Sequence, residues 1–154
     1  MTVREIMVAS PRACDPEMNC AEAAEHLWAA GCGALPVIDR DRKVIGIVTD
    51  RDICIALGTR NRRASELQIR DVMTENVATC RSNDDIHDAL KVMHDRKVRR
   101  LPVTDGAGKL EGMLCASDLL VHARHDDGSR PELSYENIVN ALRGICWHCP
   151  HAGR

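Results

Sequence analysis

The chain has 154 residues, of which 44% are hydrophobic but only 2% are aromatic, and its formal net charge is −2 at pH 7. This length is sufficient to bury a core without disulfides or metal ions, and the scarcity of aromatic residues predicts an aliphatic core. The nearly balanced charge argues against a protein whose whole surface attracts nucleic acid.

The N-terminal stretch MTVREIMVAS contains Arg4 and Glu5 and has no long apolar run. It predicts neither a signal peptide nor a membrane span, so we expect a cytoplasmic protein. In a reducing compartment most of the eight cysteines are expected to be small buried hydrophobes rather than disulfide partners. Cys20, Cys32 and Cys54 lie among apolar neighbours and fit that expectation.

The first half of the chain predicts a helix, two strands and a second helix. Ala23, Ala24 and Leu27 recur at helical spacing. A strand with Leu-Pro-Val at 35–37 precedes the polar turn DRDRK, and a second strand follows over 44–48. Thr49 is placed to cap the next helix, because its hydroxyl can accept from a backbone N–H of the first turn. Asp50 and Asp52 then suit the positive end of that helix.

The second half repeats this pattern after the polar run GTRNRRASEL (58–67), which predicts a linker. Ser82 or Asn83 is predicted to cap a helix whose apolar residues are Ile86, Ala89, Leu90 and Met93. A strand with Leu-Pro-Val at 101–103, the turn DGAGK, a strand over 110–114 and a helix from Ser117 follow.

A shift of 66 residues, the separation of Arg4 and Arg70, aligns the two halves without a gap. The coinciding pairs are Arg4/Arg70, Met7/Met73, Cys14/Cys80, Leu35/Leu101, Pro36/Pro102, Val37/Val103, Lys43/Lys109, Gly46/Gly112 and Asp52/Asp118. We therefore expect an α/β (α+β) protein of two β-α-β-β-α repeats. The expected boundaries are 1–60, a linker over 61–69, 70–124, and a C-terminal helical tail over 125–154. One such unit exposes a large apolar sheet face, so the two should pack through their sheets with pseudo-twofold symmetry.

These features resemble a tandem pair of CBS (cystathionine-β-synthase) domains, often called a Bateman module, over about residues 2–124. The features that carry the resemblance are the Leu-Pro-Val strand, the glycine-led second strand and the Thr/Ser-x-x-Asp opening of the last helix, in two copies. The resemblance implies regulatory binding of adenosine-containing ligands such as AMP, ADP or ATP in two clefts between the repeats. It also implies homodimers that stack into a disc.

The resemblance implies that Asp52 and Asp118 accept hydrogen bonds from the ribose hydroxyls. It places Thr49, Arg51 and Ser117 near phosphate, at the N-termini of the two helices. Helix capping remains the alternative explanation for both aspartates. Cys115 stands where the family has Thr or Ser, and because a thiol is a poor hydrogen-bond donor, occupancy of the second cleft is in question.

Two arginines precede the second Leu-Pro-Val. The resemblance implies phosphate contacts for Arg99 and Arg100, directed into the first cleft, whereas a solvated basic edge that discourages sheet aggregation is the alternative. Gly33 and Ala34 at the corresponding positions are uncharged, so the clefts are expected to be unequal. The implied adenine pockets are Val8, Ala9 and Ala34 in one cleft, and Val77 and Ala78 with Arg100 in the other.

The tail after residue 124 lies outside the resemblance. Tyr135, Ile138, Val139 and Leu142 have helical spacing, and Gly144 is placed to end that helix. In the following CWHCPH, Cys146 and Cys149 have the spacing of half a zinc site, and His151 could be a third ligand. His122 and His125 could complete a Cys2His2 set. The alternatives are a redox dithiol or a loose terminus without metal.

These observations favour a sensor that binds an adenine nucleotide over an enzyme, because no set of nucleophile, base and orienting residue and no glycine-rich phosphate loop is present. The alternative is a structural dimerisation or interaction protein with a metal-binding Cys/His tail. The basic runs RNRR and RKVRR are not interleaved with aromatic residues, so nucleic acid is an improbable partner, and no membrane partner is expected.

Overall fold

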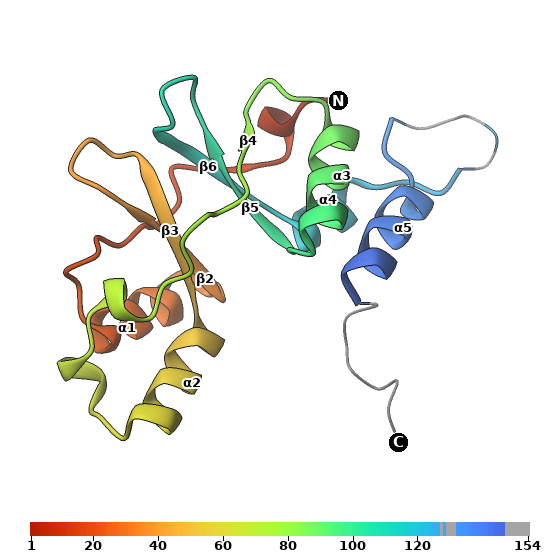
Figure 1. The fold of residues 1–154 in the computed structure, drawn as a ribbon. Helices are drawn as coiled ribbons and strands as arrows, with labels where there is room; N and C mark the ends of the chain where they lie inside the picture. Colours follow the sequence, from red (N-terminus) through yellow and green to blue (C-terminus); the bar gives the residue numbers. More distant parts are fainter. Residues whose placement is uncertain (127, 129–131, 147–154) are drawn as a thin grey trace, which may run out of the picture. The chain divides into compact units, whose positions relative to one another are not determined.

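The structure is a computed structural model that describes residues 1–126, 128 and 132–146. The chain forms two compact units. The first-repeat unit comprises residues 10–77 and 104–110, and the second-repeat unit comprises residues 1–9, 78–103 and the described residues from Glu111 onward. Figure 1 shows their helices and strands in sequence colours.

The elements follow the repeated order predicted from the sequence. The first copy contains α1 (Cys20–Ala30), β2 (Ala34–Ile38), β3 (Val44–Thr49) and α2 (Asp50–Arg60), followed by short 3-10 helices at Ala64–Glu66 and Ile69–Asp71. The second copy contains β4 (Cys80–Arg81), α3 (Ile86–Arg96), β5 (Arg100–Thr104), β6 (Leu110–Cys115) and α4 (Ala116–His122). A 3-10 helix (Val3–Glu5) and β1 (Val8–Ala9) precede both copies, and α5 (Tyr135–Cys146) follows them. The mixed α+β fold of two repeats and a C-terminal helix is confirmed.

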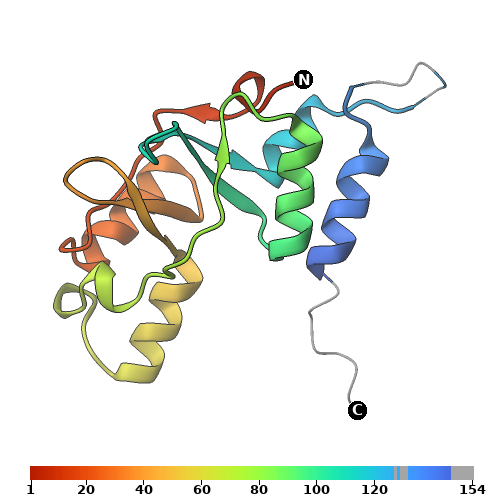
Figure 2. The ribbon, with the colours of Figure 1, turned by 45° about the horizontal axis from the view of Figure 1, so that its top comes forward.

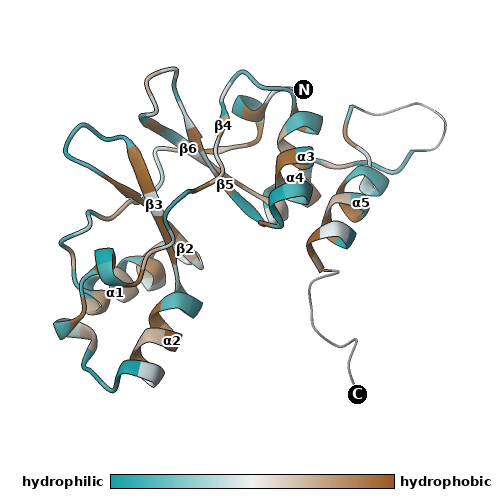
Figure 3. Cartoon of the chain, in the orientation of Figure 1, coloured by the Kyte–Doolittle hydropathy of each residue, from teal (hydrophilic) through white to brown (hydrophobic). Residues whose placement is uncertain are grey.

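The two sheets have the same plan. In one, β2 and β3 are antiparallel, and single bridges add Cys14 beside Val37 and Thr74 beside Ile47. In the other, the strand order is β1-β6-β5-β4, with Val8 opposite Met113. In the first repeat β3 is mostly hydrophobic and the β2–β3 turn is hydrophilic (Figure 3). This pattern follows from burial of the strands.

Each unit has its own aliphatic core. Leu35, Val37 and Val48 are buried in the first-repeat unit, and Leu101, Val103 and Leu114 are buried in the second-repeat unit. The segment that leads into one copy completes the core of the other unit. Leu67 and Ile69, which precede α3, are buried in the first-repeat unit, and Val3 and Ile6, which precede α1, are buried in the second-repeat unit. The segment predicted as a linker therefore contributes buried side chains.

The two hairpin turns are closed by equivalent aspartates. Asp39 Oδ1 accepts from the backbone N–H groups of Asp41 and Lys43, both at 2.9 Å. Asp105 Oδ1 accepts from those of Ala107 and Lys109, both at 2.8 Å. The Lys109 backbone N–H is the main cause of the lowered pKa of Asp105. The polar turns predicted at DRDRK and DGAGK are confirmed.

The glycines Gly46 and Gly112 are required by close packing. A Cβ on Gly46 would lie 2.8 Å from Met73 Sδ, and a Cβ on Gly112 would overlap the Met7 side chain. Each methionine comes from the segment that leads into a repeat. The repeated Met and Gly therefore occur together because the Met side chain packs against the Gly backbone.

Three details differ from the sequence predictions. Asp85, not Ser82 or Asn83, caps α3, and its carboxylate accepts from the backbone N–H of His87 at 2.8 Å. Ser82 is buried and accepts from Arg4 at 3.0 Å, so it is not available as a cap. Cys32 and Cys54 are exposed, whereas Cys20 is buried as expected.

Helix α5 also differs, because it continues through Gly144 to Cys146. A Cβ at Gly144 would overlap the His94 ring, so this glycine permits close packing of α5 on α3 rather than ending the helix. Ile138 and Ala141 on α5 are buried in the core of the second-repeat unit. Figure 2 shows α5 lying beside α3.

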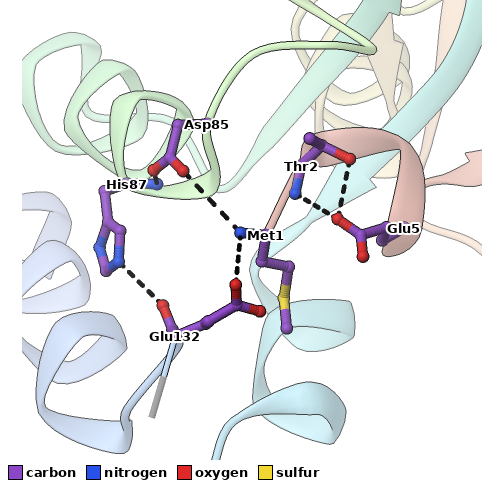
Figure 4. A network of polar contacts seen from close by, with 6 residues as sticks. All are labelled: Met1, Thr2, Glu5, Asp85, His87 and Glu132. Carbon is purple, nitrogen blue, oxygen red and sulfur yellow. Dashed lines mark hydrogen bonds and ion pairs between the residues drawn. The ribbon is translucent and has the colours of Figure 1, made fainter. Parts of the chain in front are cut away.

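A polar network ties the segment before α5 to the start of α3 (Figure 4). The Met1 amino group lies 3.3 Å from Glu132 Oε1 and 4.0 Å from Asp85 Oδ2. His87 Nε2 lies 2.9 Å from the Glu132 carbonyl oxygen. These contacts help position α5 on the second-repeat unit.

Candidate functional site

Asp52 lies in the first turn of α2, immediately after β3. Thr49 is the N-cap, and its hydroxyl accepts from the Asp52 backbone N–H at 3.1 Å. Asp52 Oδ2 in turn accepts from the Thr49 backbone N–H at 2.9 Å and from the Thr49 hydroxyl at 2.7 Å. The capping role considered for these two residues is therefore present.

Capping uses only part of the Asp52 carboxylate. Within the part of the chain that the structure describes, Oδ1 of Asp52 has no hydrogen-bond partner and the carboxylate forms no ion pair. The side chain is only half-buried. One charged oxygen therefore remains able to accept from a ligand hydroxyl, while the other holds the residue in place.

Asp118 has the same position at the start of α4, with a thiol in place of the hydroxyl. Asp118 Oδ2 accepts from the Cys115 backbone N–H at 3.0 Å. Burial, followed by the Asp118 charge, raises the pKa of the Cys115 thiol to about 11, and Arg100 opposes this rise. The thiol is therefore protonated at neutral pH, and Arg100 lies beside the Cys115–Asp118 pair.

This grouping of Arg100 with Cys115 and Asp118 was not predicted from the sequence. Its signal is the hairpin register: Ala34 at the start of β2 pairs with Thr49, and the repeat places Arg100 opposite Cys115. The neighbouring Arg99 is exposed, and its carbonyl oxygen accepts from the Ala116 backbone N–H at 2.9 Å. Arg51 and Ser117, the other predicted phosphate contacts, are exposed in the first turns of α2 and α4.

Of the residues predicted for the adenine pockets, Val8, Ala9 and Ala34 lie in strands, whereas Val77 and Ala78 precede β4. Val8 and Ala9 form β1 and are exposed, whereas Ala34 is buried at the start of β2. Val77 and Ala78 are half-buried and lie where one unit ends and the other resumes in the sequence. Asp52, Thr49 and Ala34 belong to the first-repeat unit. Val8, Ala9 and the two arginines belong to the second-repeat unit, so the joint pocket stays a prediction.

The predicted zinc ligands fall mostly in the tail. Cys146 is exposed at the end of α5, whereas Cys149 and His151 lie outside the described residues. His122 Nδ1 lies 2.8 Å from the Asp118 carbonyl oxygen, and His125 is exposed. Among residues 1–126, 128 and 132–146, no three His, Cys, Asp or Glu side chains form a group able to hold a metal ion.

A sequence profile of the CBS domain matches residues 3–59 and 69–125. The chain belongs to the CBS-domain family. Both copies of the CBS domain contain the Asp at the start of the last helix and the Gly on the second strand, and the Met of each copy packs on the Gly of the other copy. No helix among the described residues has the length and apolar character needed to cross a membrane.

Relatives share the CBS pair in chains of different length. YlbB of Bacillus subtilis is 31% identical over 86% of this chain and 88% of its own length. MK0525 of Methanopyrus kandleri is 31% identical, and the inosine-5'-monophosphate dehydrogenase of Bifidobacterium longum is 30% identical. This chain spans 54% and 23% of the lengths of those two proteins.

Solved structures of CBS proteins have the same fold. The Hypoxic Response Protein I structure with two coordinated zinc ions has a TM-score of 0.73 at 27% identity, over 80% of this chain and all of that one. CBSX2 in complex with AMP has a TM-score of 0.67 at 28% identity, over 79% and 94%. The CBS pair of MJ0100 in complex with 5'-methylthioadenosine and S-adenosyl-L-methionine has a TM-score of 0.72 at 25% identity, over 79% and 98%.

Proposed function

We propose that this CBS pair is a cytoplasmic, non-catalytic sensor, a homodimer that binds adenosine-containing ligands such as AMP, ADP or ATP. Asp52 and Asp118 accept from the ribose hydroxyls. Thr49, Arg51, Arg99, Arg100 and Ser117 contact phosphate. The adenine lies against Val8, Ala9 and Ala34 in one site and against Val77 and Ala78 in the other.

The observation that carries this proposal is the partly engaged carboxylate at the start of the last helix in both repeats. Each Asp is fixed by backbone contacts, so it is preorganised to accept hydrogen bonds. The complexes of CBSX2 with AMP and of MJ0100 with two adenosine compounds support this class of ligand. For signalling, the ligand must bind two arrangements of the protein with different affinity.

The two sites are proposed to be unequal. Thr49 offers a hydroxyl where the second repeat has a protonated thiol. The Asp52 site is therefore expected to bind more tightly than the Asp118 site, because a hydroxyl is the better hydrogen-bonding group.

A thermal-shift panel tests the ligand class. Adenosine, AMP, ADP, ATP and S-adenosyl-L-methionine are compared with GMP and with 2'-deoxy-AMP. A ligand at about 100 times its dissociation constant adds about 2.7 kcal/mol to the free energy of unfolding. We expect a rise in unfolding temperature with at least one ribose compound and a smaller rise with 2'-deoxy-AMP than with AMP. No shift from any adenosine compound would contradict the proposal.

A second proposed function concerns the tail. The Cys146-x-x-Cys149 spacing, with His151, suits a zinc ion, and Hypoxic Response Protein I contains two coordinated zinc ions. We propose a structural zinc site there, which would make the protein an interaction module. Metal analysis of tag-free protein tests it: zinc bound stoichiometrically to the wild type and lost from Cys146→Ser/Cys149→Ser supports the site, and no zinc in the wild type contradicts it.

A further inference from the structure

Helices α3 and α5, which lie side by side in the second-repeat unit, leave an open cavity of about 270 Å3 between them (Figure 2). The residues that line it are His87, Leu90, Lys91 and His94 on α3 and Asn137, Asn140 and Ala141 on α5. Leu90 and Ala141 are buried, and the other side chains are polar. No Asp or Glu is among these lining residues, so every ionisable group at the cavity is a base.

One face of α3 supplies the three basic groups. His87, Lys91 and His94 follow one another at intervals of four and three residues, so they lie on the same side of the helix. The repeat shift places Glu25 of α1 at the position of Lys91, and neither histidine recurs in the first repeat. The basic groups are therefore not part of the scaffold that the two repeats share. They occur on the helix that packs against α5, which lies outside the residues matched by the CBS profile.

The contacts of the polar side chains leave hydrogen-bond donors unused at the cavity. Among the described residues, no carboxylate forms an ion pair with Lys91. Asn137 Oδ1 accepts from the Ser134 backbone N–H at 2.9 Å, so the NH2 group of that side chain is not used by this contact. Within the same part of the chain, the side-chain amide of Asn140 has no hydrogen-bond partner. One ammonium group and two amides, from two helices, can therefore donate to one ligand.

The two histidines add positive charge when they are protonated. His87 Nε2 donates to the Glu132 carbonyl oxygen at 2.9 Å (Figure 4), and His94 Nδ1 donates to Asp95 Oδ1 at 3.0 Å. Each ring has a second nitrogen, which becomes a donor only in the imidazolium form. The Glu132 carboxylate pairs with the Met1 amino group at 3.3 Å. The other charged residues along the two helices next to the lining residues are exposed and do not line the cavity: Asp88, Asp95, Glu136 and Arg143.

We propose that this cavity binds a phosphate group, either as free phosphate or as part of a small phosphomonoester. Lys91 supplies a positive charge from α3, and Asn137 and Asn140 donate from α5. Donors on two sides of the cavity suit the tetrahedral oxygens of phosphate better than the two oxygens of a carboxylate, which lie in one plane. A bound phosphate would join α3 to α5 and stabilise the folded chain. The site includes neither Arg99 nor Arg100, so it does not depend on the proposed nucleotide sites.

Titration of inorganic phosphate into the 15N-labelled full chain, followed by NMR, tests the site. We expect saturable shifts of the side-chain amide signals of Asn137 and Asn140. Lys91→Gln should weaken binding at least about 10-fold, because a hydrogen bond between charged groups is lost. Lys43→Gln in the β2–β3 turn removes the same charge at an exposed position and is the matched control, which should keep wild-type affinity. Since Lys91 is also exposed, unfolding midpoints without phosphate should stay unchanged.

Three further anions define the ligand. Glycerol 3-phosphate binding more tightly than phosphate would identify a phosphomonoester, and any other order would identify free phosphate. Acetate binding as tightly as phosphate would contradict a phosphate site. Sulfate keeps the same charge between about pH 6 and pH 8, so its affinity should fall over this range as histidines lose their protons. A sulfate affinity that does not change with pH would contradict the part assigned to the histidines.

The location of the shifts separates this proposal from the nucleotide proposal. No phosphate-dependent shift at Asn137 and Asn140, or an equal loss of affinity in Lys91→Gln and Lys43→Gln, would overturn the cavity as a site. Phosphate shifts confined to the surroundings of Arg100 would also overturn it, while they would leave the nucleotide proposal intact. AMP titrated into Lys91→Gln tests the nucleotide sites independently.

Discussion

The two repeats have the same scaffold but differ at the helix face and at the cap of the last helix. In the first repeat, an apolar groove between α1 and α2 is uncovered, and Thr49 caps α2 with its hydroxyl. In the second, α5 covers α3 and α4, and Cys115 occupies the cap position. The core and the aspartates are therefore common to both repeats, whereas the helix face and the cap of the last helix differ.

Shortening the buried side chain of Ile138 should weaken the packing of α5 on the second repeat. Ile138 is fully buried, so Ile138→Ala is expected to lower the free energy of unfolding by about 2–5 kcal/mol. Chemical denaturation measures this change. Val139→Ala on the exposed side of the same helix is the control, and an equal loss in both variants would show that α5 does not contribute through this packing.

The close contact between α5 and α3 gives the next effect. Gly144→Ala places a Cβ in the His94 ring, and we expect a loss of about 1–3 kcal/mol in the free energy of unfolding. The double variant His94→Ala/Gly144→Ala should recover most of the loss. Gly58→Ala in α2, where nothing lies within 4 Å, should instead stabilise by up to about 1 kcal/mol. A destabilisation at Gly144 that His94→Ala does not relieve would contradict the contact.

The equivalent buried cysteines Cys14 and Cys80 should make both repeats sensitive to alkali. Burial is the main cause that raises the pKa of Cys14 and of Cys80 to about 12, from 9.0. Between these values the unfolded chain has lost the thiol protons and the folded chain keeps them, so stability falls as pH rises. The slope is about 1.4 kcal/mol per pH unit for each thiol. Cys14→Ala and Cys80→Ala should each reduce the slope in urea unfolding between about pH 9 and 11, and an unchanged slope in both would contradict the prediction.

Exchange of the caps gives the smallest effect. Thr49→Ala should cost about 1 kcal/mol of stability, because the hydroxyl bonds to Asp52 are lost. Cys115→Thr should gain a similar hydroxyl contact to Asp118 and raise ligand affinity at the second site. Thermal unfolding with and without AMP measures both. If Cys115→Thr leaves affinity unchanged, the difference between the caps does not explain unequal sites.

Local patterns in the sequence predicted the fold well. Ile86, Ala89, Leu90 and Met93 are all buried on α3, as their helical spacing predicted. The spacing of apolar residues does not fix the residue at which a helix begins. Several residues before α3 could cap it, so Asp85 was not predicted as the N-cap. Glycine is typical of a helix end, so Gly144 was predicted to end α5. Its actual role, close packing against the His94 ring, depends on a residue far away in the sequence.

The same limit applies to the candidate site. The Thr49–Asp52 geometry involves residues three apart, so spacing alone predicted it. The position of Arg100 beside Cys115 and Asp118 depends on strand register and on burial. Exposure of Cys32 and Cys54 could not be predicted either, because apolar neighbours in the sequence are equally typical of a core and of an exposed apolar groove.

Calorimetric titration with AMP tests whether Asp52 and Asp118 bind the ribose of an adenosine ligand. Asn preserves the shape of the side chain and an oxygen for the cap, whereas it removes the charge. Asp52→Asn is expected to weaken the tighter site by about 10–100-fold, since hydrogen bonds to charged groups contribute about 1.5–3 kcal/mol. Asp118→Asn should weaken the other site, and Asp50→Asn at the exposed neighbour should change neither. AMP binding with wild-type affinity to Asp52→Asn/Asp118→Asn would contradict ribose binding by these aspartates.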